Sequence, residues 1–227
     1  MDTVDNKRKT PFKKPILGIF AKQPLAGKCK TRLCPPLSFV EAADLYRVSL
    51  EETVARMQAA GCFDLAICYL GERRWFEQSF PGVRLIEQSG VDLGERMANA
   101  LQGFLRQGYR QALLIGSDAP DLPLSLVEQA IAGLQKTEVV LVPADDGGYV
   151  LIGEARHHSQ LFEDISWSSP KVLAETLEKI EQYEIPALLL DGWEDFDDLP
   201  SLQLFLRRSP QCRTAEYLRH NLTQHFS

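Results

Sequence analysis

Short apolar runs alternate with longer segments of helical periodicity along the chain, and this alternation limits its fold more than any other feature. The apolar runs lie at residues 15–20, 63–70, 83–88, 111–118, 138–145, 148–154 and 185–190. Each run has the length of a buried strand, and segments with an amphipathic helical pattern separate most of them. This order predicts a single α/β domain with a mostly parallel sheet and helices on both of its faces.

Local signals predict where three of the helices begin. A capping box is expected at Ser38 with Glu41, and a second one at Ser125 with Glu128. Ser169-Pro170 predicts a third start, of a helix that runs to about residue 182, because proline fits the first helical position.

The composition is that of a globular protein without a nucleic-acid partner. Hydrophobic residues make up 44% of the 227 residues and charged residues 25%, which is enough for a packed core. The formal net charge is −6, whereas proteins that bind a phosphate backbone usually have a basic balance or a basic face. We therefore expect small-molecule ligands and no nucleic acid.

Targeting and redox features favour the cytoplasm. No segment approaches the roughly 18 consecutive apolar residues of a membrane span. Residues 1–14 are basic and lack an apolar signal core, so we expect a flexible basic tail followed by one domain over residues 15–227. The five cysteines form no CxxC pair and no cluster with histidine, which predicts reduced thiols in a cytoplasmic protein.

The first polar loop, AKQPLAGKCKTRL at residues 21–33, is strongly cationic and contains no acid. Its basic side chains are Lys22, Lys28, Lys30 and Arg32. The loop follows the first predicted strand, at the sheet edge where α/β proteins bind ligands, and Gly27 lets the backbone approach a ligand closely. The pattern predicts contacts to a phosphate or diphosphate, whose oxygens an arginine can hold in pairs. The alternative is a solvated charged loop.

Polar residues also end the apolar run at 111–118. We expect Ser117 to contact a nucleotide and Asp118 to bind a divalent cation that also touches the ligand's phosphates. The alternative is that Asp118 only ends the strand. Asp121, three residues on, is as consistent with a helix start as with a ligand contact.

The stretch LVPADDGGYVLIG places Asp145, Asp146, Gly147 and Gly148 between two apolar runs. An Asp-Gly pair in this setting predicts a β-hairpin turn. Two adjacent carboxylates repel one another, which a bound cation would relieve, and adjacent glycines leave room for a sugar or phosphate. We expect the turn to hold both carboxylates over a pocket, with Asp146, and after it Asp145, as the catalytic base.

Two further stretches give weaker signals. The segment at residues 191–199, DGWEDFDDL, has five acids and no base, so it predicts surface and helix-start acids, one of which could complete a metal site. Gln88, Asp92 and Arg96 lie around two glycines and are candidates for contact with a nucleobase or an acceptor.

The chain contains five motifs in order that resemble one bacterial glycosyltransferase-like family: FAKQPLAGKCKTRL, DLGERM, IGSDAPDLP, PADDGGYVLIG and ISWSSPKVL. The resemblance extends from Ile16 to Leu199 and implies the GT-A fold of nucleotide-diphospho-sugar transferases, which is Rossmann-like. Some members of that family are assigned to arsenosugar biosynthesis. The chain is more distantly similar to guanylyltransferases that act on phospholactate and to molybdenum-cofactor nucleotidylyltransferases.

The resemblance also implies roles for residues. It implies nucleotide diphosphate contacts at Lys22, Lys30 and Arg32, and metal or nucleotide-sugar contact at Asp118. Sugar or acceptor contacts would come from Asp145, Asp146, Gly147, Trp167 and Ser168.

One departure from the family concerns the second metal ligand. The family's Asp-x-Asp pair near the end of the resemblance falls here on Gly192 and Glu194. Glu194 is therefore the expected second ligand, and Asp195 could substitute for it.

These patterns predict a metal-dependent glycosyltransferase that uses Mg²⁺ or Mn²⁺ and transfers a sugar from a nucleotide-diphospho-sugar to a small acceptor. The alternative is a nucleotidyltransferase that acts on a nucleoside triphosphate and a small phosphorylated or carboxylated substrate. A third reading is a nucleotide-binding protein without turnover, which the altered Asp-x-Asp pair supports.

Overall fold

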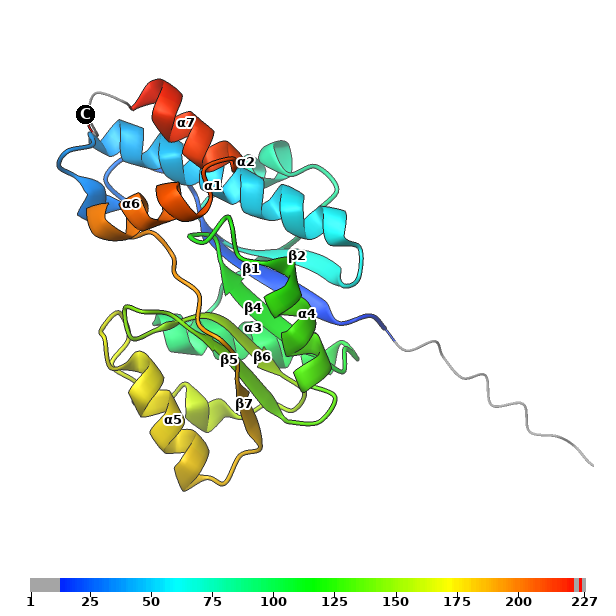
Figure 1. Cartoon of the computed structure of the whole chain (residues 1–227). Coiled ribbons are helices and arrows are strands. Elements are labelled where there is room, and N and C mark those ends of the chain that lie inside the picture. Colours follow the sequence, from blue (N-terminus) through cyan, green and yellow to red (C-terminus); the bar gives the residue numbers. More distant parts are fainter. Residues whose placement is uncertain (1–12, 223–224, 226–227) are drawn as a thin grey trace, which may run out of the picture.

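The computed structural model describes residues 13–222 and residue 225, so most of the expected basic tail lies outside the described residues (Figure 1). The strands are β1 (Ile16–Lys22), β2 (Asp64–Leu70), β3 (Arg84–Glu87), β4 (Ala112–Gly116), β5 (Val139–Pro143), β6 (Tyr149–Glu154) and β7 (Ala187–Leu189). The helices are α1 (Phe39–Ala60), α2 (Arg73–Ser79), α3 (Leu93–Arg106), α4 (Leu124–Gly133), α5 (Val172–Gln182), α6 (Leu199–Arg208) and α7 (Arg213–Asn221).

The strands form one seven-stranded sheet in the order β3-β2-β1-β4-β6-β5-β7. Only β6 is antiparallel to its neighbours, β4 and β5; the other pairs are parallel. The prediction of a mostly parallel sheet is thus confirmed. The predicted hairpin is also confirmed, since β5 and β6 pair as antiparallel strands joined by the Asp-Asp-Gly-Gly turn.

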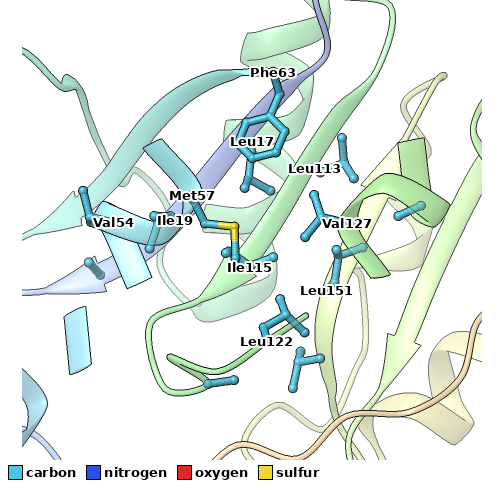
Figure 2. Close-up of a cluster of buried hydrophobic side chains, with 14 of the residues drawn as sticks. Leu17, Ile19, Val54, Met57, Phe63, Leu113, Ile115, Leu122, Val127 and Leu151 are labelled. Atoms are coloured by element: carbon cyan, nitrogen blue, oxygen red, sulfur yellow. The ribbon is translucent and has the colours of Figure 1, made fainter. Parts of the chain in front are cut away.

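Helices cover both faces of the sheet, as predicted, because alternate residues of each strand point to opposite faces. On one face Leu17 and Ile19 of β1 pack with Met57 of α1 and Val127 of α4 (Figure 2). On the other face Ile16 packs in a second cluster with side chains of α3 and α5.

A third apolar cluster lies outside the sheet, between α1 and the last two helices. Leu45 of α1 packs with Phe205 of α6, Leu218 of α7 and Phe196, which precedes α6. Figure 1 shows α6 and α7 beside α1. The cluster fixes where the chain between β7 and α6 crosses the sheet edge.

The structure confirms one predicted helix start and corrects two. Ser38 and Glu41 form the capping box of α1. No side chain caps α4, which begins at Leu124 after Pro123, so Ser125 lies inside its first turn. The helix expected at Ser169-Pro170 begins only at Val172, because Leu173 N–H donates to Gly147 O at 2.8 Å and not to Ser169 O, as an earlier helical turn would require.

Two other expectations concern the chain as a whole. All five cysteines are free. Among the described residues, no helix has both the length and the apolar character that crossing a membrane requires.

Candidate active site

A cleft of about 430 Å³ opens at the carboxyl edge of the sheet, where β1 and β4 end and β6 begins. Five of the residues predicted from the sequence line it: Lys22, Gln88, Ser117, Asp118 and Ser168. Four further polar residues also line it: Tyr46, Arg96, Tyr149 and Asp195. The strand-end clusters of the sequence therefore meet in space, as the topology requires.

The floor of the cleft is held by hydrogen bonds between β4 and α1. The hydroxyls of Tyr46 and Ser117 lie 2.8 Å apart, and Ser49 donates to the carbonyl of Ser117. The Tyr46 hydroxyl also accepts from the backbone N–H of Lys22 at 3.0 Å. Ser117 is buried, so its main contact is with the protein, and it positions the neighbouring Asp118.

Lys30 lies in the middle of an acidic centre. Its ammonium donates to Asp197 Oδ1 at 2.8 Å and to the carbonyl of Phe196 at 2.5 Å, and it lies 3.0 Å from Asp118 Oδ1. The side chain is only 2% exposed. Burial opposes the charge of Lys30, but the carboxylates of Asp118 and Asp197 outweigh it and raise the pKa of the ammonium.

The acidic loop, which we define as residues 191–198, carries Asp195 into the cleft. The loop passes the ends of two strands, since Trp193 N–H donates to Pro143 O at 2.9 Å and Phe196 N–H donates to Asp118 O at 3.2 Å. Burial, and then the nearby carboxylates of Asp197 and Asp118, raise the pKa of Asp195 to about 7. The positive charge near Asp195 is thus too small to offset its burial and the neighbouring carboxylates.

Glu194 points away from this centre, toward Arg208 of α6. Arg208 Nη1 lies 3.1 Å from Glu194 Oε2, and Arg208 also binds both oxygens of Asp121 at 2.8 and 3.1 Å. Its guanidinium lies 4.4 Å from the ring centroid of Trp193. Glu194 does not line the cleft, and Asp121, which is buried, serves as the anchor of this network.

The hairpin turn, residues 144–148, borders the acidic loop. Asp146 Oδ1 accepts from Gly148 N–H at 2.8 Å, and its charge is among those that raise the pKa of Asp195. Asp145 lies beside Glu194, whose pKa is raised because the two carboxyl groups share a hydrogen bond. Both aspartates are exposed and neither belongs to the lining of the cleft; Asp145 lies toward Glu194 and Asp146 toward Asp195.

The serine loop, residues 165–171, closes the cleft on the side of α3 and α5. Ser168 lines the cleft. Trp167 packs its indole against the backbone of Gly94, where a Cβ would overlap the ring, and it belongs to the cluster beneath α3. Trp167 therefore positions the serine loop and does not line the cleft.

The other predicted ligand residues are divided between the cleft and its surroundings. Gln88 lines the cleft, with its side-chain amide donating to the carbonyls of Cys68 and Ala21. Asp92 caps α3 by accepting from Glu95 N–H at 2.8 Å. Among the loop cations, Lys28 and Arg32 are exposed outside the lining, and Gly27 has φ 74°, which favours glycine.

Arg96 and Asp195 line the cleft, although the sequence signals for them were only weak. Lys22 and Arg96 are the cations among the described residues of the lining. Arg96 Nε donates to Gly90 O at 3.1 Å, which directs the side chain from α3. Its presence in the motif DLGERM was the available signal. Asp195 differs from its acidic neighbours only through the path of the loop, which the sequence does not display.

The acids of the cleft do not form a ready-made metal cage. Across residues 13–222 and 225, no group of three or more His, Cys, Asp or Glu side chains is arranged to hold a metal ion. Asp118 Oδ1 is nevertheless buried without accepting a hydrogen bond. Mg²⁺ commonly uses one or two carboxylates together with waters and substrate phosphates, so the residues present fit a cation whose other ligands arrive with a phosphate.

Comparisons with known proteins identify the family and the fold of the chain. The model of the family described as "Uncharacterized protein conserved in bacteria (DUF2064)" matches residues 53–169. A solved protein from Desulfovibrio desulfuricans G20, provisionally assigned as a nucleotide-diphospho-sugar transferase, is 33% identical, with 93% of this chain and 96% of that chain covered and a TM-score of 0.87. This match confirms the predicted fold. No curated protein matches the chain.

Two solved structures of low identity share the fold. CMP:2-keto-3-deoxy-manno-octonic acid synthetase, solved with CTP, is 13% identical over 87% of this chain and 99% of its own, with a TM-score of 0.53. Rv0371c of Mycobacterium tuberculosis H37Rv, solved with manganese, is 14% identical over 86% and 98%, with a TM-score of 0.50.

Proposed function

The chain belongs to the DUF2064 family, and we propose that it is a cytoplasmic, metal-dependent glycosyltransferase that uses a nucleotide-diphospho-sugar donor. The observation that carries the proposal is the pairing of Asp118 and Asp195 in a cleft that also presents Lys22 and Arg96. Two carboxyl groups in one cleft favour a divalent cation, and the adjacent cations favour the phosphates that such a cation would bridge. The fold shared with the Desulfovibrio protein supports a nucleotide-sugar donor. Because some members of the resembled family are assigned to arsenosugar biosynthesis, the proposal includes an acceptor of that pathway type.

Mg²⁺ or Mn²⁺ would be held by Asp118 and Asp195. Asp195 replaces Glu194 in this role, because Glu194 is engaged with Arg208 while Asp195 lines the cleft. When bound, the cation would supply positive charge against the leaving nucleoside diphosphate. Manganese in the similarly folded Rv0371c supports a divalent ion in this type of site.

The chain's own residues would bind and orient the two substrates. Lys22 faces the diphosphate from the end of β1, and Arg32 and Lys28 extend from the same loop. Arg96 and Gln88 also line the cleft and would contact the nucleoside. Asp146, on the cleft side of the hairpin turn, is positioned to accept a proton from an acceptor hydroxyl. Gly147, Gly148 and Ser168 would lie along the sugar or acceptor.

A nucleotidyltransferase is the second candidate, and one observation favours it. The synthetase with CTP bound shares the fold, and the same cleft cations and metal ligands would serve attack on an α-phosphate. The two reactions release different products: a nucleoside diphosphate leaves as the sugar passes to the acceptor in the first, and pyrophosphate leaves the nucleoside triphosphate in the second. A protein that binds nucleotides without turnover would release neither.

The test is a thermal-shift screen of nucleotide sugars and nucleoside triphosphates, each with and without Mn²⁺. A ligand that binds only the folded protein raises the melting temperature by mass action, so the preferred donor should give the largest shift, and only with metal. Asp118→Asn should abolish this shift without unfolding the protein. Asp191→Asn, which changes an exposed acid of the acidic loop, is the control and should keep the shift. If no nucleotide shifts the wild-type melting temperature, the proposal is wrong.

A further inference from the structure

Lys30 comes from the cationic loop but does not face the cleft as Lys22 does. Its side chain is 2% exposed, and it is absent from the described lining of the cleft. The ammonium makes hydrogen bonds to Asp197 and to the Phe196 carbonyl, and an ion pair with Asp118. It also lies 4.3 Å from the centroid of the Phe196 ring. The ammonium is therefore held by two hydrogen bonds and one ion pair, all of them to the protein.

A phosphate in the cleft could engage this ammonium only at the expense of those contacts. Turning it outward would leave Asp118 and Asp197 without their shared counter-ion, and burying unpaired charges is costly. The backbone also fixes the side chain inward, since Lys30 has a left-handed conformation with φ 49°. Lys30 is therefore unlike Lys22, Lys28 and Arg32, which are exposed.

The ammonium occupies the position next to Asp118 that a divalent cation would need. It lies 3.0 Å from Asp118 Oδ1, and two cations bound to one carboxylate repel each other strongly in a poorly solvated site. No described group of side chains forms a complete metal cage. A nucleotide changes this balance, because its phosphates bring both negative charge and oxygen ligands.

We propose that Lys30 is a tethered counter-ion that weakens divalent-metal binding at Asp118 until a nucleotide is present, so that the metal enters together with the phosphates. The inference rests on the proposed metal role of Asp118. It makes Lys30 a positioning residue: it holds the acidic loop through Asp197, and it sets the order in which metal and nucleotide bind.

This role and a phosphate-binding role predict different metal affinities, in the absence of nucleotide, for a variant with a neutral side chain at position 30. If Lys30 bound phosphate, its loss would weaken nucleotide binding and leave metal binding without nucleotide unchanged. If it is a tethered counter-ion, its loss should strengthen metal binding without nucleotide. A gain in metal affinity without nucleotide therefore separates the two roles.

The experiment measures Mn²⁺ affinity without nucleotide, by electron paramagnetic resonance of the free ion or by calorimetry. Lys30→Met should bind Mn²⁺ about tenfold more tightly than wild type, because one repelling charge is removed from a partly buried site. Lys30→Arg keeps the charge and should stay weak. Lys136→Met removes an exposed charge after α4 and is the control for net charge. If folded Lys30→Met binds Mn²⁺ no more tightly than wild type, the inference is wrong.

Two additional variants keep the test decisive. Lys30→Met with Asp197→Asn removes an ammonium and a carboxylate together, so it should fold even if the single variant does not, and should still gain Mn²⁺ affinity. Adding Asp118→Asn to Lys30→Met should cancel the gain. If the gain survives, the metal does not bind at Asp118 and the proposed function itself is at fault; if no gain occurs while wild type binds nucleotide with Mn²⁺, only the role of Lys30 is wrong.

Discussion

The two walls of the cleft are held in place by different physical means. The acidic loop is fixed by two cations, Lys30 through Asp197 and Arg208 through Glu194. The adjacent wall, made of the hairpin turn and the serine loop, is fixed mainly by close backbone approach. Gly147 lies against the backbone of Pro170, where any Cβ would overlap it, and Gly147 O accepts from Leu173 N–H at 2.8 Å.

The difference determines which wall can respond to ligands. Electrostatic contacts depend on every charge that enters the cleft, whereas contacts set by backbone packing do not. A metal or a diphosphate would therefore change the balance around Asp195 on the acidic loop. Asp146, on the hairpin turn, would keep its position. Under the proposed function, the acidic loop would respond to the metal and phosphates, whereas the hairpin turn and the serine loop would hold the acceptor side in place.

The largest effect on stability is expected at Arg208, the second of the two cations. Arg208→Met leaves the buried carboxylate of Asp121 without its charged partner, and breaking such a pair costs about 3 kcal/mol. Urea unfolding should show this loss in the free energy of unfolding. Arg207→Met, at an exposed neighbouring position, should change it little. Equal effects of both variants would show that the acidic loop does not depend on Arg208.

A smaller effect is expected from the wall held by packing. Gly147→Ala introduces a Cβ at φ 86° against the Pro170 carbonyl, and strain of this kind costs about 2 kcal/mol. Because no charge is involved, the loss should be the same at low and high salt, whereas that of Arg208→Met should shrink as salt rises. Gly148→Ala, whose backbone is not left-handed, is the matched control and should cost less. A Gly147→Ala loss that varies with salt would contradict the comparison.

The smallest effect concerns the one carboxylate that helps to hold the serine loop. Ser166 donates from its backbone N–H and from its hydroxyl to Glu175, and these bonds lower the pKa of Glu175. A carboxylate with a lowered pKa stabilises the fold above its unfolded pKa, about 4.3 for glutamate, and this contribution disappears as the pH falls through the folded value. Glu175→Gln should therefore lower the midpoint of urea unfolding slightly at neutral pH and not in acid. An unchanged difference in acid would exclude an ionic role.

The sequence predicted the edge of the sheet on which the site lies but not the contacts within it. Asp118 and Lys22 were found because each directly follows an apolar run, and strand ends of a parallel sheet share an edge. The sequence interpretation placed Glu194 first as the second metal ligand and Asp195 as its substitute, whereas the structure places Asp195 in the lining of the cleft and Glu194 beside Arg208. Neighbouring residues of a loop can face opposite sides, and here Arg208, fourteen residues beyond Glu194, decides which side each faces.

Two other differences arise from tertiary contacts. The hydrogen bond from Lys30 to Asp197 spans 167 positions along the chain, and no local pattern predicts a contact between residues so far apart. Ser125 matched the spacing of a capping box, but Pro123 already set the start of α4. Local signals succeeded where one segment decides the geometry, as at the Ser38 cap, and failed where two distant segments decide it together.

The placement of the acidic loop after the last strand has a consequence for how the protein matures. Strand β7 ends at Leu189, so the sheet can be paired before Asp195 and Arg208 have left the ribosome. The apolar core would then form first, with the cleft still open on one side. The acid that completes the proposed metal site is delivered only when α6 and α7 pack on α1. The second of the two proposed metal ligands would thus join Asp118 only after the sheet has formed.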